Sequence, residues 1–414
     1  MDDHPDAVPP DAATAVDEVD PLSAMDPEMA AHPQPVFKMM RDEMPVMPVT
    51  GTGSGSGVVL TRKVDVDDVL RHPEIFSSNF DAVNLMNVRP LIPLQIDPPE
   101  HKKFRKLLDP IFAPREVARL EEELVSAVNE LIDGFIDRGE VDFAKEFSTL
   151  FPTKVFLGLL GLPVEELPTF LAMKDGIIRP HIVVGSTYGA QDTKAHQKKT
   201  ADSIYDYFNK VLDQREIERR DDLLSRFLDA TLDGEKLTRE DILDICFLFL
   251  IAGLDTVTAT LDCMFAYLAQ HPDQRRQIVE DPSLIPAAIE ELLRWETPVM
   301  AVARVAAQET EIDGCPVHKG DGVMIMLASV NTDEADLPDA EVVRFDREVN
   351  RHLAFGGGVH RCLGSHLARI ELRTALREWH RRIPDYAVPE GHTLVYTPSI
   401  RSIETFPMEF SAAG

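Results

Sequence analysis

A helical repeat over the middle of the chain is the feature that most limits how this sequence can fold. Between residue 100 and about residue 300, apolar residues recur at intervals of three and four, which places them along one face of an α-helix. The run from Val117 to Phe135 is one example, with Glu and Arg residues on its opposite face. Patterns typical of β-strands are short and occur at residues 58–61, 309–329 and 394–410. The sequence therefore predicts a mainly α fold with small β-sheets (α+β).

The chain divides into a short acidic tail and one long folded unit. Residues 1–32 are rich in Asp, Pro and Ala and show no apolar periodicity, so they predict a disordered tail. We expect residues 33–414 to form a single cooperative domain, although length alone allows two or three domains at roughly 150 residues each. No Lys or Arg precedes Lys38, which argues against a signal or transit peptide and favours a cytoplasmic location.

Charge and cysteine usage exclude several kinds of partner and site. The formal net charge of -29 repels phosphate backbones, so nucleic acid is not an expected partner. The four cysteines are widely spaced and include no CxxC pair, which argues against a disulfide framework and against zinc or iron–sulfur clusters. The longest apolar run, residues 245–254, ends at Asp255 and is shorter than the ~20 residues of a membrane span. It predicts a buried core helix that begins after an N-cap at Thr238.

A first glycine-rich stretch, GTGSGSG at residues 51–57, has a spacing that resembles a phosphate-binding loop. A short β-branched run follows it, however, and no helix opens on its glycines. A dinucleotide-binding fingerprint needs a helix at that point. The stretch therefore predicts the turn of a β-hairpin.

A second glycine-rich stretch, FGGGVHRCLG at residues 355–364, places a cysteine directly before a helical run. The three glycines allow the backbone to turn tightly and to approach a flat ligand, because they carry no Cβ. Free N–H groups at the start of a helix favour a thiolate at Cys362, and a thiolate can bind iron. A lone cysteine is otherwise a small buried apolar residue, which is the interpretation that we keep for Cys246, Cys263 and Cys315.

This second stretch matches the pattern F-G-x-G-x-H-x-C-x-G at every fixed position, and it resembles the haem-binding loop of the cytochrome P-450 haem-thiolate monooxygenases. Three further motifs extend the resemblance over roughly residues 35–411. The resemblance implies the single-unit P-450 fold, with Cys362 as the ligand to the iron of haem b. The cofactor-binding residues that it implies are His101, Arg105, Arg304, Phe355, Gly356, His360, Cys362 and Gly364.

The first of these motifs, DPPEHKKFRKLL at residues 97–108, predicts a helix that starts at its two prolines. His101 and Arg105 are four positions apart and so share one face of that helix. Such a pair can simply face solvent. The resemblance implies instead that both residues bind a haem propionate, together with Arg304 and His360. Arginine suits this task because it can donate two parallel hydrogen bonds to a carboxylate.

The second motif, AGLDTVT at residues 252–258, puts an acid and a hydroxyl inside the long apolar helix. Burying these groups without partners would be costly, and a threonine hydroxyl can take a helix carbonyl for itself. One interpretation is a local kink of the helix. The resemblance implies instead a catalytic pair, in which Thr256 holds dioxygen and Asp255 relays protons.

The third motif is EELLR at residues 290–294. Glu291 and Arg294 lie three positions apart and can pair on one helix face, as many solvated residues do. The resemblance implies a buried ion pair that supports the structure near the cysteine loop. Its third partner is predicted to be Arg344, in a stretch, PDAEVVRFD, that is longer than the family pattern.

The resemblance also implies which residues line a substrate pocket. Nearly all of them are apolar, which favours a terpenoid, a steroid-like compound or a similar hydrophobic small molecule. The predicted pocket residues are Ala82, Val83, Leu85, Leu248, Ile251, Ala252, Met300, Val302, Ser399 and Ile400.

The reaction that the resemblance implies is a monooxygenation, in which one oxygen atom of dioxygen enters the substrate and the other is reduced to water. We expect the electrons to come from a separate ferredoxin or flavodoxin with its NAD(P)H reductase. A basic cluster could attract such a partner, or it could simply solvate the surface. Its members are Lys102, Lys103, Lys106, Arg361 and Arg369.

Two other functions remain open on the same fold. A peroxygenase would use hydrogen peroxide directly and would not need an acid and an alcohol, so Asp255 and Thr256 argue against it. A non-enzymatic haem binder, such as a sensor or carrier, is disfavoured by that same pair and by a wide apolar pocket. A haem-free protein would have to contain all four motifs by coincidence.

Overall fold

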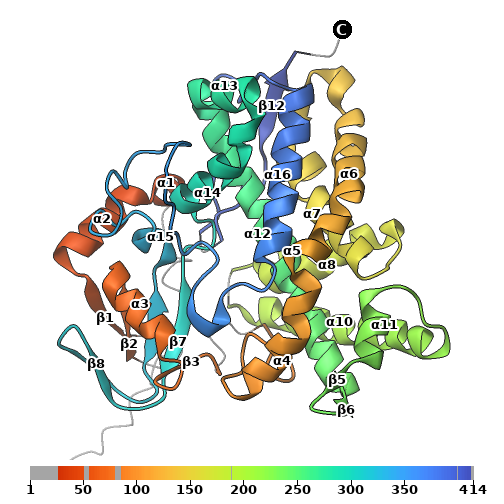
Figure 1. The fold of residues 1–414 in the computed structure, drawn as a ribbon, viewed down its shortest axis with the longest axis vertical. Coiled ribbons are helices and arrows are strands. Elements are labelled where there is room, and N and C mark those ends of the chain that lie inside the picture. The colour runs from red at the N-terminus through yellow and green to blue at the C-terminus, as the bar shows by residue number, and fades with distance from the viewer. Residues whose placement is uncertain (1–26, 51–55, 80–84, 188, 399, 412–414) are drawn as a thin grey trace, which may run out of the picture.

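The computed structural model describes residues 27–50, 56–79, 85–187, 189–398 and 400–411. Most of the chain is helical, as the sequence predicts, and the helices form one body (Figure 1). The α-helices are α1 (Pro27–Ala31), α2 (Gln34–Glu43), α3 (Lys63–Arg71), α4 (Glu100–Leu108), α5 (Pro114–Val117), α6 (Glu121–Asp133), α7 (Leu150–Leu159), α8 (Leu167–Ile178), α9 (Pro180–Val184), α10 (Gln191–Ile217), α11 (Leu223–Asp229), α12 (Arg239–Gln270), α13 (Pro272–Glu280), α14 (Ile285–Glu296), α15 (Leu327–Val330) and α16 (Ser365–Arg382).

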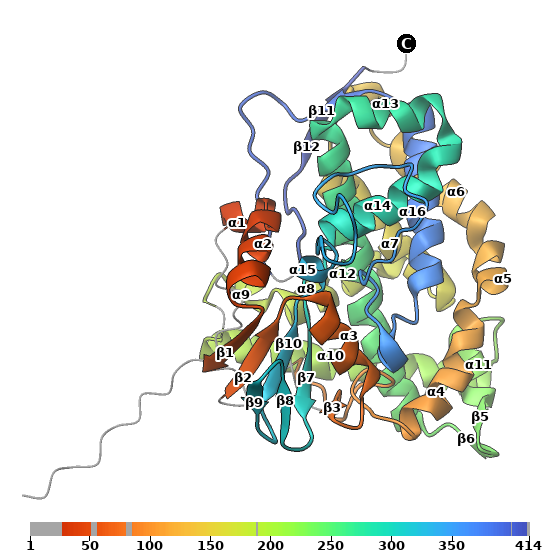
Figure 2. The same cartoon turned by 60° about the vertical axis from the view of Figure 1, so that its left-hand side comes forward.

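The β-strands are short and form small sheets beside the helices. The largest sheet has the order β1-β2-β10-β7-β3 and lies with α1, α2 and α3 on one side of the molecule (Figure 2). The strands are β1 (Val46–Thr50), β2 (Ser56–Leu60), β3 (Phe76–Ser77), β4 (Glu140–Asp142), β5 (Thr231–Leu232), β6 (Glu235–Lys236), β7 (Val302–Ala306), β8 (Thr310–Ile312), β9 (Cys315–Val317), β10 (Gly322–Ile325), β11 (Tyr386–Ala387) and β12 (Pro407–Phe410).

The glycine-rich stretch at residues 51–57 connects two paired strands. Strands β1 and β2 are antiparallel, and Thr50 is opposite Ser56 at the end of the ladder. The predicted hairpin is therefore confirmed on both sides of residues 51–55, which lie outside the described residues.

Helix α12 runs through the middle of the helical body and forms its core. A capping box starts it: the Thr238 hydroxyl accepts from the Asp241 N–H at 3.1 Å, and the Asp241 carboxylate accepts from the Thr238 N–H at 3.0 Å. These bonds satisfy N–H groups that a helix start leaves free. The helix is long and apolar enough to cross a membrane, but 78% of its most apolar stretch is buried inside the protein. This burial confirms the predicted core helix.

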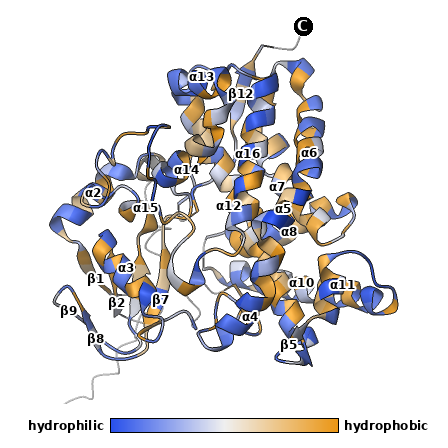
Figure 3. Ribbon diagram, viewed as in Figure 1, coloured by the Kyte–Doolittle hydropathy of each residue, from blue (hydrophilic) through white to orange (hydrophobic). Residues whose placement is uncertain are grey.

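The predicted amphipathic run from Val117 to Phe135 is helical but not continuous, since a 3₁₀ turn separates α5 from α6. Its apolar side is buried at Leu124, Val128 and Ile132 and packs on α16, whereas its other side is hydrophilic (Figure 3). Helix α16 is anchored near its C-terminal end by its own Trp379, which is fully buried. Three phenylalanine rings surround this indole at centroid distances of 5.0 to 5.2 Å. The helix that follows the cysteine loop is therefore held by α6 along one side and by an aromatic cluster near its C-terminal end.

The boundary of the predicted tail is wrong by a few residues. Helix α1 occupies residues 27–31, inside the stretch 1–32 that we expected to be disordered; residues 1–26 lie outside the described residues. The buried Arg401 guanidinium donates to the carbonyl oxygens of Ala30 at 2.7 Å and Ala31 at 3.1 Å. A distant arginine thus fixes a segment whose own sequence shows no periodicity.

Candidate active site

The cysteine loop, residues 355–364, connects the segment after α15 to the start of α16. The Cys362 N–H donates to the Phe355 carbonyl at 2.9 Å and closes the loop. Gly356 and Gly358 have φ values of 65° and 63°, a left-handed conformation that favours glycine. At Gly358, a Cβ would also overlap the main-chain carbonyl oxygen of Leu70 in α3. The backbone conformation therefore requires glycine at both Gly356 and Gly358. At Gly358 the lack of space beside Leu70 requires it as well.

The Cys362 thiol lies directly before α16, as predicted, and has a side that solvent can reach. Protein surrounds the rest of the side chain, and this burial raises the pKa of the thiol. The Gly364 N–H and the charges of Arg105, Arg361 and Arg369 act in the opposite direction and favour the thiolate. The surroundings thus contain donors and cations for an anionic sulfur, while one side stays accessible to a ligand.

Two buried imidazoles lie together near this loop without polar partners. The rings of His101 in α4 and His360 are 4.2 Å apart between centroids. Both ring nitrogens of His101 and Nε2 of His360 are buried and have no hydrogen-bond partner among the described residues. Burial, with contributions from neighbouring cations, lowers the pKa of His101 to about 4 and that of His360 to about 3. Orphaned buried nitrogens are costly, so this pair suits a ligand with polar groups.

The two predicted propionate-binding arginines differ in their surroundings. Arg304, in β7, is buried, and burial lowers its pKa to about 10. Arg105 donates from Nε to Asp109 at 2.7 Å and from Nη1 to the Arg361 carbonyl at 2.7 Å. The Arg105 side chain therefore supports the cysteine loop by a hydrogen bond to the main chain of the loop. The positive charge of Arg304 helps to lower the pKa values of both His101 and His360.

These residues fit a haem. A thiol with an accessible side suits the iron, glycines clear the space beside it, and unpaired imidazole nitrogens with nearby guanidinium groups suit two carboxylates. Leu363 follows the cysteine and packs against the cluster that contains Leu254 of α12. The loop and the central helix thus share one apolar contact region.

The Thr256 hydroxyl takes a carbonyl of its own helix, as predicted. Its Oγ1 donates to the Ala252 carbonyl at 2.8 Å, while Ala252 is exposed and Thr256 is half-buried. Oxygen lone pairs of the hydroxyl remain free to accept hydrogen bonds. The side chain can therefore interact with a molecule beside this part of α12.

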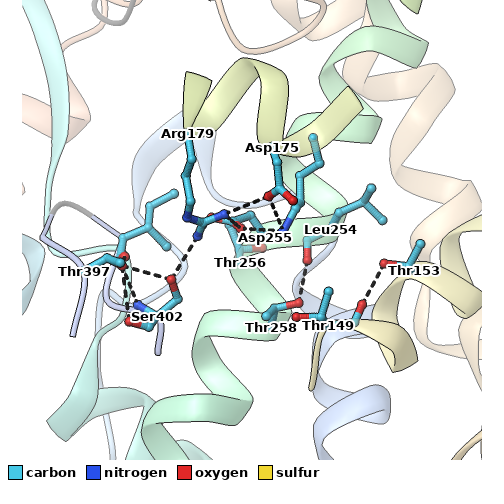
Figure 4. Close-up of polar contacts among 12 residues, drawn as sticks. Thr149, Thr153, Asp175, Arg179, Leu254, Asp255, Thr256, Thr258, Thr397 and Ser402 are labelled. Carbon is cyan, nitrogen blue, oxygen red and sulfur yellow. Dashed lines mark hydrogen bonds and ion pairs between the residues drawn. The ribbon is translucent and has the colours of Figure 1, made fainter. Parts of the chain in front are cut away.

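Asp255 is fully buried and is held by cations that the sequence did not indicate. Arg179, between α8 and α9, donates to its two oxygens at 2.8 and 3.1 Å (Figure 4). The Lys174 ammonium of α8 is 3.4 Å from one of these oxygens. Burial raises the pKa of Asp255, but these two cations outweigh burial and lower it. Arg179 also donates to the Ser402 hydroxyl at 2.9 Å. The carboxylate is thus ionised and tied to elements far away in the sequence.

The predicted ion pair between Glu291 and Arg294 is present and buried, with nitrogen to oxygen distances of 2.8 and 2.9 Å. The prediction of Arg344 as its third partner is wrong. The Arg347 side chain donates to Glu291 at 2.8 Å, whereas Arg344 contributes only its main-chain N–H at 2.9 Å. The Arg344 side chain is 46% exposed and pairs with surface aspartates. Asn350 completes the set at 2.9 Å.

The predicted pocket residues differ in how exposed they are. Leu85, Ile251, Val302 and Ile400 are partly exposed, Ala252 is exposed, and Leu248 is nearly buried in the helical core. Ala82, Val83 and Ser399 lie outside the described residues. Met300 is a correction: it is 0% exposed and packs with Phe37, Val59 and Met326 in a separate cluster. Its neighbour Val299, which pairs with Ile400 in a β-bridge, is partly exposed, as expected where successive residues of an extended segment point to opposite faces.

Comparisons with known proteins agree with this geometry. The family model "Cytochrome P450" matches residues 180–379. The chain is 34% identical over 347 residues to "Probable cytochrome P450 127A1" of Sinorhizobium fredii, covering 83% of this chain and 80% of that protein. It is 32% identical over 351 residues to "Steroid C26-monooxygenase" of Mycobacterium tuberculosis, covering 84% and 92%. The crystal structure of CYP109E1 from Bacillus megaterium in complex with testosterone has a TM-score of 0.83 and 26% identity, covering 93% and 99%.

Proposed function

Since the chain belongs to the cytochrome P450 family and is therefore a haem-thiolate monooxygenase, we propose that it oxygenates a hydrophobic small molecule, of the terpenoid or steroid type, in the cytoplasm. We further propose that the cofactor is haem b and that a separate ferredoxin or flavodoxin, with its NAD(P)H reductase, supplies the electrons. The relative named Steroid C26-monooxygenase and the crystal structure of CYP109E1 in complex with testosterone support the substrate class.

The observation that carries the cofactor assignment is the pair of unpartnered imidazoles beside the cysteine loop. We assign Cys362 as the iron ligand and His101, His360 and Arg304 as donors to the propionates. Arg105 would position the loop through the Arg361 carbonyl. When bound, haem supplies the activation of dioxygen and the transfer of one oxygen atom to the substrate.

Two residues on α12, Asp255 and Thr256, would transfer the protons that the reaction consumes. The reaction consumes one dioxygen, two electrons and two protons, and it yields an oxygenated substrate and one water. We assign to the Thr256 hydroxyl the delivery of protons at the oxygen-binding side, since it is half-buried and follows the relay acid directly. Asp255 would bring protons from the side of Arg179 and Lys174. This transfer requires the carboxylate to leave at least one of these cations, because an ion-paired aspartate with a lowered pKa is a poor proton carrier.

The apolar wall supports a hydrophobic substrate. The accessible members of the predicted wall, Leu85, Ile251, Ala252, Val302 and Ile400, are all aliphatic, and such a wall excludes water and binds apolar surface. None of these five side chains can anchor a charged substrate. We infer that shape and apolar contact, rather than an ion pair, orient the substrate.

The basic cluster is smaller than the sequence indicates. Lys103 is paired with Glu100 and Asp233, each at 3.1 Å, and Arg369 is paired with Glu290 at 2.7 Å. Lys102, Lys106 and Arg361 are exposed. We assign the electron partner to these three cations, with the other two serving the structure.

The test is a binding and turnover screen with the haem-loaded protein. Steroids and terpenoids that enter the pocket are expected to displace a water from the iron and shift its absorption, and one of them should be oxygenated with NADPH and a ferredoxin system. Substrate oxidation with hydrogen peroxide alone, and none with the reductase system, would instead support a peroxygenase. A panel that binds but is never oxidised would support a haem carrier.

A further inference from the structure

A second acidic residue on α14, Glu290, belongs to a network of its own. It is adjacent in sequence to Glu291 but contacts none of the arginines of the Glu291 cluster among the described residues. Instead, its two oxygens accept from Nε and Nη2 of Arg369, each at 2.7 Å. This two-point geometry fixes the plane of the guanidinium group as well as its position. Burial raises the pKa of Glu290, but Arg369 and His352 lower it to about 2, so the pair is ionised at neutral pH.

His352 braces the same carboxylate from the other side. Its Nδ1 accepts from the Ala354 N–H at 3.2 Å, so in the neutral ring the hydrogen is on Nε2. That nitrogen lies 3.1 Å from Glu290 Oε2 and donates to it. The His352 side chain is nearly buried, and its ring is 6.1 Å from that of Phe355 between centroids. Glu290 is thus held by two donors, each from an element next to the cysteine loop.

The fixed guanidinium lies over the first residue of the cysteine loop. The Arg369 Cζ is 4.4 Å from the centroid of the Phe355 ring, within the range of a cation–π contact. The Phe355 carbonyl in turn accepts the Cys362 N–H at 2.9 Å. A continuous series of contacts therefore leads from Glu290 through Arg369 and Phe355 to the main chain of the cysteine.

We propose that Glu290 is a positioning residue that holds the Arg369 cation against Phe355, and that this held cation raises the reduction potential of the iron bound to Cys362. The proposal rests on the haem assignment under the proposed function. A fixed positive charge near the site favours the state with one more electron, and Arg369 is only 26% exposed, so solvent screens it incompletely. The same charge favours the anionic form of the sulfur ligand.

The primary experiment measures the reduction potential of the haem-loaded protein by spectroelectrochemistry, together with the carbon monoxide difference spectrum. Arg369→Gln is expected to lower the potential and to increase the fraction of the form without thiolate ligation. Arg377→Gln is the matched control, because Arg377 is on the same helix and is paired in a similar way with Glu121 and Glu378. It is expected to leave both readings at the wild-type values.

Glu290→Gln separates positioning from simple charge. If Glu290 acts by holding Arg369, the Glu290→Gln substitution frees the Arg369 guanidinium. The reduction potential then falls, as it does in Arg369→Gln. If the two residues act as independent charges, removing a negative charge raises the potential, and that result would overturn the proposal. Arg369→Lys keeps the charge but loses the two-point geometry, so it is expected to lie between the wild type and Arg369→Gln.

A double-mutant cycle tests the route through the ring. Phe355→Leu removes the aromatic face, so adding Arg369→Gln to it should change the potential by less than in the wild-type background. Equal changes in both backgrounds would exclude Phe355 as the intermediate. Failure of the wild-type protein to show a thiolate-ligated haem would contradict the proposed function, whereas a normal wild type with Arg369→Gln equal to Arg377→Gln would contradict this inference alone.

Discussion

The two sides of the candidate site are held by different kinds of contact. On the cysteine side, Glu291 and Arg294 are joined to each other and to main-chain groups of the loop at residues 331–344. On the pocket side, Asp255 is held only by side chains, from Arg179 and Lys174, among the described residues. Glu291 also accepts from the side chains of Arg347 and Asn350, so the cysteine side combines main-chain and side-chain contacts, whereas the ion pairs of Asp255 can exchange partners without a change in the main chain. We therefore expect the contacts of Glu291 and Arg294 to stay the same during the reaction, and the ion pairs of Asp255 to be able to change.

The largest expected effect is on the cysteine side. Arg294→Ala leaves the fully buried Glu291 without its main partner, and breaking such a pair costs about 3–5 kcal/mol of unfolding free energy. Thermal and urea unfolding of the purified protein measure this loss. Arg344→Ala is the control, and it should change stability by only about 0.5 kcal/mol or less, because its side chain is exposed. Equal losses in the two variants would contradict the placement of the Arg344 side chain outside the cluster.

The next effect concerns the glycines of the cysteine loop. Gly358→Ala combines a left-handed φ with an overlap against the Leu70 carbonyl, so it is expected to cost about 3 kcal/mol and to reduce haem occupancy. Gly356→Ala has the same conformational strain but open space around its Cβ, which limits its cost to about 1–2 kcal/mol. Unfolding midpoints and haem content per protein measure both variants. A larger loss for Gly356→Ala would show that Leu70 is not what restricts the loop.

Glu371 on the cysteine side and Asp255 on the pocket side should make stability depend on pH in opposite directions. Burial raises the pKa of Glu371 in α16 from 4.5 to about 8, so the folded protein keeps this proton while the unfolded chain loses it. Stability from this group is therefore lost as the pH rises from about 4.5 to about 8, by up to about 1.4 kcal/mol per pH unit. Asp255, whose pKa is lowered, contributes stability that is lost as the pH falls.

Glu371→Gln and Asp255→Asn, unfolded in urea between pH 5 and pH 9, separate these two contributions. Glu371→Gln should stabilise the protein most at high pH and flatten the decline. Asp255→Asn should cost stability at neutral pH, because it leaves Arg179 and Lys174 without a carboxylate. A Glu371→Gln variant that follows the wild-type curve would show that the side chain is ionised in the folded protein.

The smallest effect on stability is expected at Thr256. Thr256→Ala removes one hydrogen bond to the Ala252 carbonyl, which contributes about 1 kcal/mol or less. The thiolate-type carbon monoxide spectrum should persist, while electrons are diverted from product to hydrogen peroxide and water. Thr260→Ala is the control, since the Thr260 hydroxyl makes a similar bond one turn later. Unchanged product formation per NADPH in Thr256→Ala would remove this hydroxyl from the proton relay.

Local sequence patterns predicted the parts of the site that depend on neighbouring residues. Each of these features involves residues that are close together in sequence: the N-cap at Thr238, the loop before α16, and the pair of Glu291 with Arg294. The partners of Asp255 do not, because Lys174 and Arg179 are 81 and 76 positions away. Lysine and arginine near a turn carry no pattern that points to a distant buried acid.

Two predictions failed for reasons of register. The third partner of Glu291 was assigned to Arg344, but the arginine whose side chain reaches Glu291 is Arg347, three positions later. Met300 lies in an extended segment, where one position decides between the pocket face and the opposite core. The pairing of Glu290 with Arg369 was missed because adjacent glutamates look alike in sequence, although they enter different networks.

The most direct test of the central claim is the carbon monoxide difference spectrum of the reduced, haem-loaded protein. The wild type and Cys315→Ala, whose cysteine lies in β9, should both show the red-shifted band of a thiolate-ligated haem, and Cys362→Ala should lack it. A Cys362→Ala variant that keeps the band, or a wild type without it, would contradict the assignment of this sulfur as the iron ligand.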